Sequence, residues 1–101
     1  MRISNHAKKR MKERCGFSRK SQERMTEKAF RDGITHKQTK GRLHRWVTSL
    51  FFKNCNANNI RLYGDNAYIF CGETLVTVIP IPWNLKKDFV KMIEKAGIEN
   101  D

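Results

Sequence analysis

The sequence predicts an α+β domain in which N-terminal helices pack on a three-stranded antiparallel β-meander, followed by a C-terminal helix. Two observations predict it. From Asn59 to Pro82, three short runs of strand-forming residues are separated by Gly64-Asp65 and Gly72-Glu73, the residue types that two-residue hairpin turns require. On both sides of this stretch, apolar residues recur at the three- and four-residue spacing of amphipathic helices.

The length and composition indicate one domain. With 101 residues and 39% hydrophobic content, the chain can bury one modest core, so we expect a single domain over 1–101. The ends at 1–3 and 98–101 are expected to fray.

Capping residues and apolar spacing predict the first two helices. Ser4 is an N-cap candidate for a helix that ends at Gly16, and Ser18 is one for a helix over about 19–32. Gly33 is expected to be the C-terminal glycine of the second helix. The expected buried residues are Ala7, Met11, Cys15, Met25, Ala29 and Phe30.

The remaining elements follow from the same signals. The polar, basic stretch 35–41 has no periodicity and is expected to be an exposed loop. Apolar residues at i, i+3, i+4, i+7 and i+8 favour a helix over 42–54, although a strand through the same residues is the alternative. After the meander, Asn84 is expected to cap a helix that closes at Gly97.

Two-residue turns at both hairpins would give each strand two unlike faces. In that register Arg61 lies opposite Tyr68, and Tyr68 lies opposite Thr77. This row is expected on a face left open to solvent or only partly lined, while the other face packs on the helices. The residues expected on the packed face are Ile60, Leu62, Ala67, Ile69, Cys71, Val76 and Val78.

The charge points to a polyanionic partner. The chain has 21 Lys and Arg against 10 Asp and Glu, a formal charge of +11. Nucleic acid, with RNA favoured over DNA, is the first expectation, and an antitoxin or an acidic host protein is the second. An anionic membrane surface would attract the same charge. The candidate nucleic-acid-binding residues are Lys9, Arg10, Arg14, Lys37, Lys40, Arg42 and Arg45.

Cysteine usage and hydropathy indicate a cytoplasmic protein. Cys15, Cys55 and Cys71 are an odd number without a C-x-x-C pair, which argues against a disulfide framework or a zinc ribbon. No apolar run approaches the length of a membrane span, and the N-terminus lacks the apolar segment of a signal peptide. We therefore expect no membrane partner. The sequence leaves the oligomeric state undetermined.

The familiar catalytic motifs are absent: there is no G-x-S-x-G, no P-loop and no H-E-x-x-H, and the carboxylates do not cluster as a metal site requires. No metal and no cofactor is expected. Metal-independent RNA cleavage needs only an acid, a base and groups that stabilise phosphate charge. The candidate catalytic residues are His6 as general acid or base, with Arg61, Tyr68 and Thr77 as phosphate contacts.

For five further side chains, the sequence gives only weak indications of a function. His36 and His44 lie in or beside basic segments and could contact phosphate, but surface positions without a role are favoured. Cys55 lacks a partner at metal-binding spacing. Trp46 is expected in the core, and for Trp83 packing is favoured over base stacking.

Two segments resemble a known family. The opening ISNHAKKRMKERCGFS resembles the S-x-H-A-x-x-R-M-x-x-R-G-[IF]-[ST] start of a family of small bacterial and phage domains, whose members end in a meander similar to YGDNAYIFCGETLVTVIPIP. That family is placed near the metal-independent ribonuclease fold shared by barnase, EndoU, colicin-type tRNases and RelE toxins. The resemblance covers residues 3–33 and 59–87.

The resemblance implies a toxin-like ribonuclease that cleaves through a 2′,3′-cyclic phosphate. His6 matches the motif histidine, Arg10 and Arg14 match the motif arginines, and Thr77 matches a polar position of the last strand. The end IEND lacks the basic and tyrosine residues of RelE toxins, so ribosome-dependent cleavage is not implied. The alternative hypothesis is a non-catalytic phage or bacterial module that binds nucleic acid or an acidic protein surface.

Overall fold

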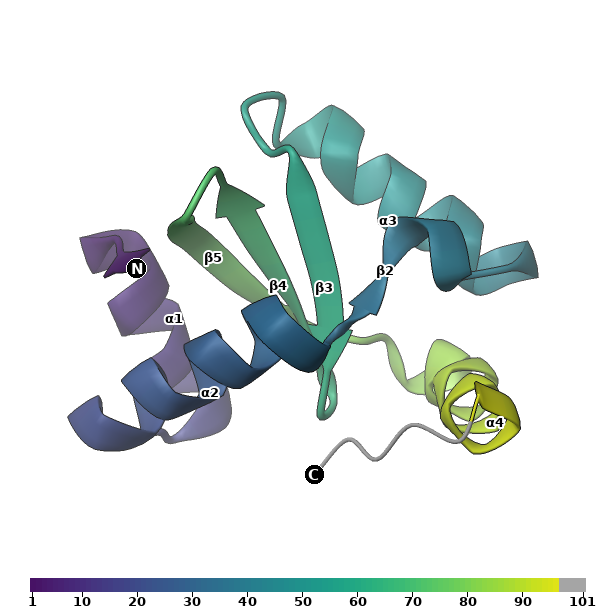
Figure 1. Cartoon of the computed structure of the whole chain (residues 1–101), viewed down its shortest axis with the longest axis horizontal. Helices are drawn as coiled ribbons and strands as arrows, with labels where there is room; N and C mark the ends of the chain where they lie inside the picture. Colours follow the sequence, from purple (N-terminus) through teal and green to yellow (C-terminus); the bar gives the residue numbers. More distant parts are fainter. Residues whose placement is uncertain (97–101) are drawn as a thin grey trace.

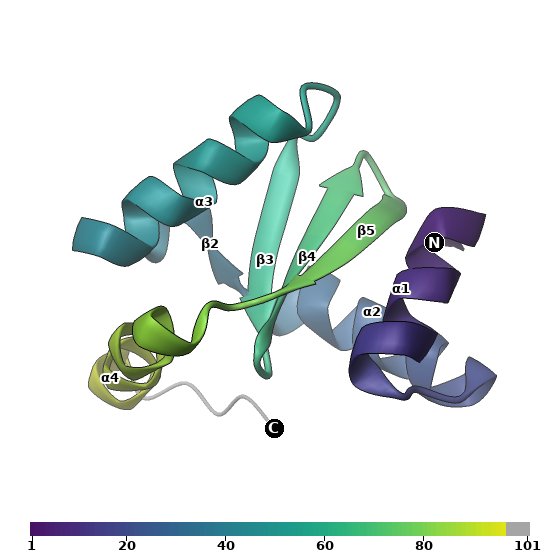
Figure 2. The ribbon, with the colours of Figure 1, turned by 180° about the vertical axis from the view of Figure 1, so that it is seen from behind.

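The computed structural model describes residues 1–96, in which one β-sheet lies between two pairs of α-helices. Figures 1 and 2 show α1 and α2 on one side of the sheet and α3 and α4 on the other. The α+β class predicted from the sequence is therefore confirmed. The expectation that 98–101 fray lies outside the described residues.

The predicted meander forms the middle of the sheet. Strands β3 (Asn59–Tyr63), β4 (Asn66–Cys71) and β5 (Thr74–Pro80) pair antiparallel in chain order. Two short strands, β1 (Arg2–Ile3) and β2 (Ile34–Thr35), extend it at its edges. The order within residues 1–96 is β1-β5-β4-β3-β2, with β1 parallel to β5, so the sheet has five strands and is mixed.

The two edge strands correct two expectations. The N-terminal residues do not fray, because the Arg2 amide donates to the Glu73 carbonyl at 3.2 Å and the Ser4 amide donates to the Leu75 carbonyl at 3.0 Å. The stretch after Gly33 is not wholly an exposed loop: it begins in β2 and continues as a short 3-10 helix, η1 (His36–Gln38). Thr39 behind it is only 3% exposed.

Helices α1 (Asn5–Cys15) and α2 (Arg19–Asp32) begin where their capping residues predict. The Ser4 hydroxyl accepts from the Ala7 amide, and the Ser18 hydroxyl accepts from the Ser21 amide. Gly33 differs from the expectation: its φ is −65°, so it is not a left-handed cap. A Cβ there would lie 2.5 Å from the Ala29 carbonyl oxygen, which is why the chain has glycine where α2 meets the sheet.

On the other side of the sheet, α3 (Gly41–Lys53) confirms the helical alternative for 42–54. A second 3-10 helix, η2 (Trp83–Leu85), precedes α4 (Lys86–Ala96), so Asn84 lies inside η2 instead of capping α4. Trp46 packs on the core as predicted. The expectation for Trp83 was wrong, because this side chain is 85% exposed.

Both faces of the sheet are covered. Under α3 and α4, one apolar cluster includes Ile60, Leu62, Ile69 and Phe89. Under α1 and α2, a second cluster includes Ala7, Met11, Tyr63, Tyr68, Phe70, Leu75 and Val78. The expectation of an open sheet face was therefore wrong. The helices needed to cover it were predicted, but they divide into two pairs instead of gathering on one side.

A β-bulge changes the register of the last strand. Cys71 pairs with Thr74 and Phe70 with Leu75, as two-residue turns require, but Ile69 then pairs with Thr77 and Tyr68 with Val78. The irregularity leaves Val76 without an opposite residue on β4, so the rest of β5 is turned over relative to the prediction. Thr77 consequently lies on the α3–α4 face of the sheet, whereas Tyr68 lies on the α1–α2 face.

Helix α1 also satisfies the outer edge of β5 beyond the short pairing with β1. The Ser4 hydroxyl donates to the Val76 carbonyl at 3.2 Å, and Nη1 of Arg14 donates to the Val78 carbonyl at 2.8 Å. An unpaired strand edge is a site for aggregation, and these side chains occupy its acceptors. Two residues of the S-x-H-A-x-x-R-M-x-x-R motif thus hold the fold together.

Candidate nucleic-acid interface

The predicted catalytic row does not form. Tyr68 is completely buried under α1 and α2, and its hydroxyl has no hydrogen-bond partner within the described chain. Arg61 lies beside it, but its guanidinium donates to the Gly33 carbonyl at 3.0 Å and to Oδ1 of Asn59 at 3.1 Å. Because Thr77 lies on the opposite face, these three side chains offer no common surface to a substrate.

His6 is exposed on α1 and lies apart from the other three candidates. Its helix covers the outer edge of β5, whereas Arg61 is on β3 with β4 between them. Within residues 1–96, His6 makes no hydrogen bond or ion pair that would orient its ring. A general acid or base needs such positioning, so the geometry does not assemble the predicted catalytic set.

The predicted phosphate-binding cations divide between the two sides of the sheet. On α1, Arg14 donates a hydrogen bond to the Val78 carbonyl at the edge of β5, and Arg10 lies 3.7 Å from the Glu13 carboxylate. On α3, Arg42 donates to both carboxylate oxygens of Asp88 on α4 and to the Asn84 carbonyl. Exposed cations that the described residues leave without an ion pair are Lys9, Lys37, Lys40 and Arg45.

The segment from Gly33 to Gly64 carries no Asp or Glu. Its cations are Lys37, Lys40, Arg42, Arg45, Lys53 and Arg61. By contrast, α1 and α2 include Glu13, Glu23, Glu27 and Asp32 among their cations. The segment that forms η1 and α3 therefore has no carboxylate to neutralise its cations. This favours the approach of a polyanion.

The solvent face of α3 adds an aromatic side chain to this charge. Arg45 and Phe52 are seven residues apart on the helix, so they lie on one stripe, opposite to the buried Leu43, Val47 and Leu50. Phe52 is 82% exposed, an unusual position for so large an apolar side chain. We call the exposed residues Lys37, Arg45, Phe52 and Lys53 the η1–α3 face.

Two histidines connect η1 to α3, the two elements of this face. The His36 and His44 rings stack with centroids 4.2 Å apart and an interplanar angle of 17°. The Thr48 hydroxyl donates to the His44 carbonyl, so its oxygen accepts from Nε2 of His36 at 2.8 Å. The Thr39 hydroxyl donates to the His36 carbonyl and accepts from Nδ1 of His44 at 3.0 Å. These directions place an N–H on Nε2 of His36 and on Nδ1 of His44.

The expectation that the two histidines have no role beyond the surface is thus replaced by a structural one. They join η1 to α3, and Phe51 packs edge-on against His36 at 5.2 Å. Burial, and secondly the charge of His44, lower the pKa of His36. The sequence signal for the pair is weak, because the two residues are eight positions apart across a helix boundary.

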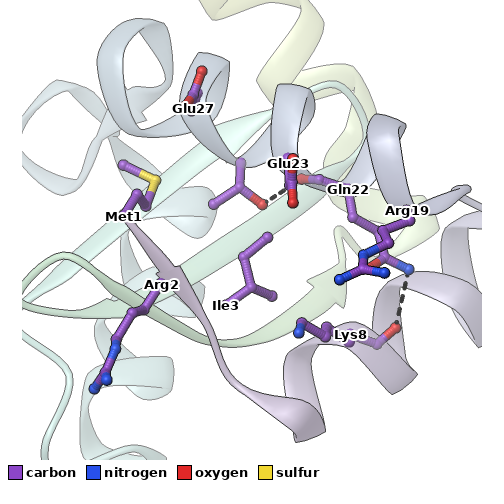
Figure 3. Close-up of a pocket in the computed structure, with 9 residues that line it drawn as sticks. Met1, Arg2, Ile3, Lys8, Arg19, Gln22, Glu23 and Glu27 are labelled. Atoms are coloured by element: carbon purple, nitrogen blue, oxygen red, sulfur yellow. Dashed lines mark hydrogen bonds between the residues drawn. The ribbon is translucent and has the colours of Figure 1, made fainter.

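A hollow of about 470 Å³ between β1, α1 and α2 is a less suitable polyanion site (Figure 3). It holds Lys8 and Arg19, but also the carboxylates of Glu23 and Glu27. Its inner wall is structural: the Gln22 side-chain amide donates to the Lys8 and Phe17 carbonyls. The mixed signs leave little net attraction for phosphate.

Another hollow, of about 450 Å³, lies near the β3–β4 turn, and Arg14, Cys15 and Lys86 are among its lining residues. Burial raises the pKa of the Cys15 thiol, against a smaller opposing effect of Arg14, so the reactive thiolate is disfavoured. Burial also raises the pKa of Tyr68, with smaller effects from Cys15 and Tyr63. Neither group is prepared for nucleophilic or acid–base chemistry near neutral pH.

Among residues 1–96, no three His, Cys, Asp or Glu side chains come together as a metal site would require. No helix in this part of the chain combines the length and the apolar character needed to cross a membrane. Comparison with models of protein families, with curated proteins and with solved structures finds no significant match.

Sequence reasoning missed Phe52 and Lys53 as surface candidates. The signal for Phe52 was present: once 42–54 is taken as a helix, Phe52 falls seven residues after Arg45 and opposite to the apolar stripe. The run of consecutive apolar residues at 50–52 concealed it, because such a run is equally typical of a buried strand.

Proposed function

We propose that this protein binds nucleic acid through the η1–α3 face, with single-stranded RNA as the preferred form. The observation that carries the proposal is the exposed Phe52 on the same helical stripe as Arg45, within a segment that has no carboxylate. Lysine and arginine neutralise phosphates, and an aromatic ring on the same surface stacks on a base.

The preference for single strands follows from the aromatic contact. A base stacks on a side chain only when it is not stacked in a duplex, and unpaired bases are most common in RNA loops and ends. The cations of the face are on one side of α3 and on η1, so they can follow a phosphate backbone while Phe52 contacts a base.

Binding without catalysis has more support than RNA cleavage. The residues of the proposed surface are exposed to solvent. In contrast, Arg61 is hydrogen-bonded to the Gly33 carbonyl, Tyr68 and Thr77 are buried on opposite faces of the sheet, and His6 lies apart from all three. We accordingly expect RNA that is incubated with the protein in EDTA to remain intact. Cleavage products ending in 2′,3′-cyclic phosphate, absent with the His6→Ala variant, would restore the ribonuclease hypothesis.

Two charge-matched variants test the location of the binding surface. Lys37→Glu/Arg45→Glu reverses two charges on the η1–α3 face, and Lys9→Glu/Lys12→Glu reverses two exposed charges on α1. Both variants change the net charge equally. Fluorescence anisotropy with a labelled single-stranded RNA should show a loss of about tenfold or more in the first variant, and less than about threefold in the second.

The salt dependence gives a second readout. The slope of log K against log salt should fall by about 1.4 in the first variant, since each phosphate contact on a single strand contributes roughly 0.7. Phe52→Ala should weaken binding about five- to tenfold or more without changing this slope, because stacking releases no counterions. Equal losses in both charge-reversal variants would show that binding depends on net charge alone and would overturn the assignment to this face.

A further inference from the structure

A groove lies between α3 and α4, apart from the Arg45–Phe52 stripe. It encloses about 510 Å³, within the range of ligand-binding clefts. Ile34, Leu43 and Met92 contribute apolar side chains to it, from β2, α3 and α4 respectively. Its other lining residues are polar or charged: Gln38, Lys40, Asp88, Lys91 and Lys95.

The charge of this groove is one-sided. Lys40, Lys91 and Lys95 are exposed at its rim. Asp88 is the single carboxylate among the described lining residues, and it already accepts two hydrogen bonds from Arg42, at 3.2 and 3.3 Å. The lysines therefore have no carboxylate of the groove available to them, and the groove presents a positive rim around an apolar floor.

This combination fits a different occupant from the η1–α3 face. The floor is aliphatic and contains the thioether of Met92, and none of its described lining residues has an aromatic ring on which a base would stack. Branched and unbranched aliphatic side chains fit such a surface, and a methionine adapts its shape to them. Lysine ammonium groups around it select carboxylates, so protein chemistry is favoured over nucleic acid.

We propose that the α3–α4 groove docks an acidic amphipathic segment of a partner protein. One or two aliphatic side chains of that segment insert between α3 and α4 over Met92, and its carboxylates pair with Lys91 and Lys95 along one side of α4. Lys91 and Lys95 are four residues apart, so they match carboxylates spaced by one helical turn in the partner. This is the helix-in-groove mode of recognition.

The test uses three synthetic peptides of equal charge. The first is a labelled helical peptide with leucine at i, i+3 and i+4 and glutamate at its other positions. The second replaces each leucine by serine, and the third has the same composition as the first in scrambled order. The first should bind at least about tenfold more tightly than either control, because only it aligns an apolar stripe with carboxylates on both sides.

Two pairs of variants locate the peptide. Lys91→Glu/Lys95→Glu should weaken binding of the first peptide by about tenfold or more, whereas Lys9→Glu/Lys12→Glu, which reverses two exposed charges on α1, should change it by less than about threefold. Met92→Ala, checked for native circular dichroism, should also weaken it by about three- to tenfold. Lys37→Glu/Arg45→Glu should leave peptide binding within about threefold of the unmodified protein.

Three results would overturn the proposal: equal binding of the leucine and serine peptides, equal losses in the two charge-matched variants, or displacement of the peptide by single-stranded RNA through the η1–α3 face. The first would show attraction to acidic charge without a groove. The second would show dependence on net charge, and the third would place both ligands on one surface.

Discussion

The two sides of the sheet use similar helices for different purposes. Helices α1 and α2 carry many charges, yet several of their polar side chains are bound to the backbone: Ser4 and Arg14 to β5, and Gln22 to α1 and the following loop. On the other side, α3 and η2 leave large aromatic side chains in solvent, namely Phe52 and Trp83. The buried Tyr63 and Tyr68 lie on the first side of the sheet, and the exposed aromatic side chains lie on the second.

The difference teaches that the number of cations on a helix does not locate a binding surface. The first side has the S-x-H-A-x-x-R-M-x-x-R motif, but its arginines are bound to Glu13 and the Val78 carbonyl. The second side has fewer cations, but its η1–α3 segment has no carboxylates to oppose them. What distinguishes a site here is the absence of internal partners together with exposed apolar surface.

The largest expected effect concerns Tyr68, which tests whether the first side is core. Tyr68→Ala should lower the free energy of unfolding by about 3–5 kcal/mol, the usual cost of removing a buried ring. Tyr68→Phe should raise it by about 1 kcal/mol, because it removes a buried hydroxyl that has no partner among the described residues. Urea denaturation measures both.

The opposite result for Tyr68→Phe would change the interpretation of this side. A loss of about 1 kcal/mol or more would mean that the hydroxyl is hydrogen-bonded, for example to a buried water, and that the α1–α2 core contains a polar site. Phe70 is a suitable comparison for the ring itself: it is equally buried, packs edge-on against Phe30, and has no polar atom. Phe70→Ala should match Tyr68→Ala within about 1 kcal/mol.

The next effect in size separates structural from functional arginine. Arg14→Ala should lower the free energy of unfolding by about 1 kcal/mol, because it leaves the Val78 carbonyl at the β5 edge without its donor. Arg45→Ala should change stability by less than about 0.5 kcal/mol, because the side chain is exposed and has no partner within residues 1–96. RNA affinity should respond in the reverse order, with Arg45→Ala the more harmful.

Thermal unfolding and RNA anisotropy on the same two proteins decide this prediction. For a domain of this size, 1 kcal/mol corresponds to about 4–8 °C in Tm. A variant Arg14→Ala that kept its Tm and lost RNA binding would identify α1 as the binding surface and reverse the comparison of the two sides.

Much of the fold could be predicted because local signals agree with it. Ser4 and Ser18 cap their helices, the Gly64-Asp65 and Gly72-Glu73 turns join the three main strands, and the apolar stripe of α3 is the one that the structure buries. Strands β1 and β2 have two residues each, too few to show any periodicity, and they are defined only by their partners.

The predicted row of Arg61, Tyr68 and Thr77 does not form, because the register of β5 depends on one unpaired residue that the sequence does not reveal. A regular ladder places Thr77 opposite Tyr68, whereas the bulge at Val76 places Val78 there and moves Thr77 to the other face. Nothing in the run Leu75 to Ile79 marks this position, since every residue in it is acceptable in a regular strand. The bulge is favoured by tertiary packing: Val78 joins the cluster that contains Tyr68.

The smallest expected effect is the pH dependence that His36 contributes, which tests whether the second side is held together at η1. The pKa of His36 lies below its ordinary value of 6.5 in the folded protein, chiefly through burial and then through the charge of His44. The unfolded chain therefore takes up a proton at higher pH than the folded one. The stabilisation is present above about pH 6.5 and declines as the pH falls below it.

His36→Gln removes this titration while keeping an amide that can donate toward Thr48. Unfolding monitored from about pH 7 to pH 5 should show a shallower decline in Tm for the variant than for the unmodified protein. Equal slopes would mean that the His36 ring accepts a proton without cost, and η1 would then be joined to α3 by the threonine hydroxyls and Phe51 instead of by the stacked imidazoles.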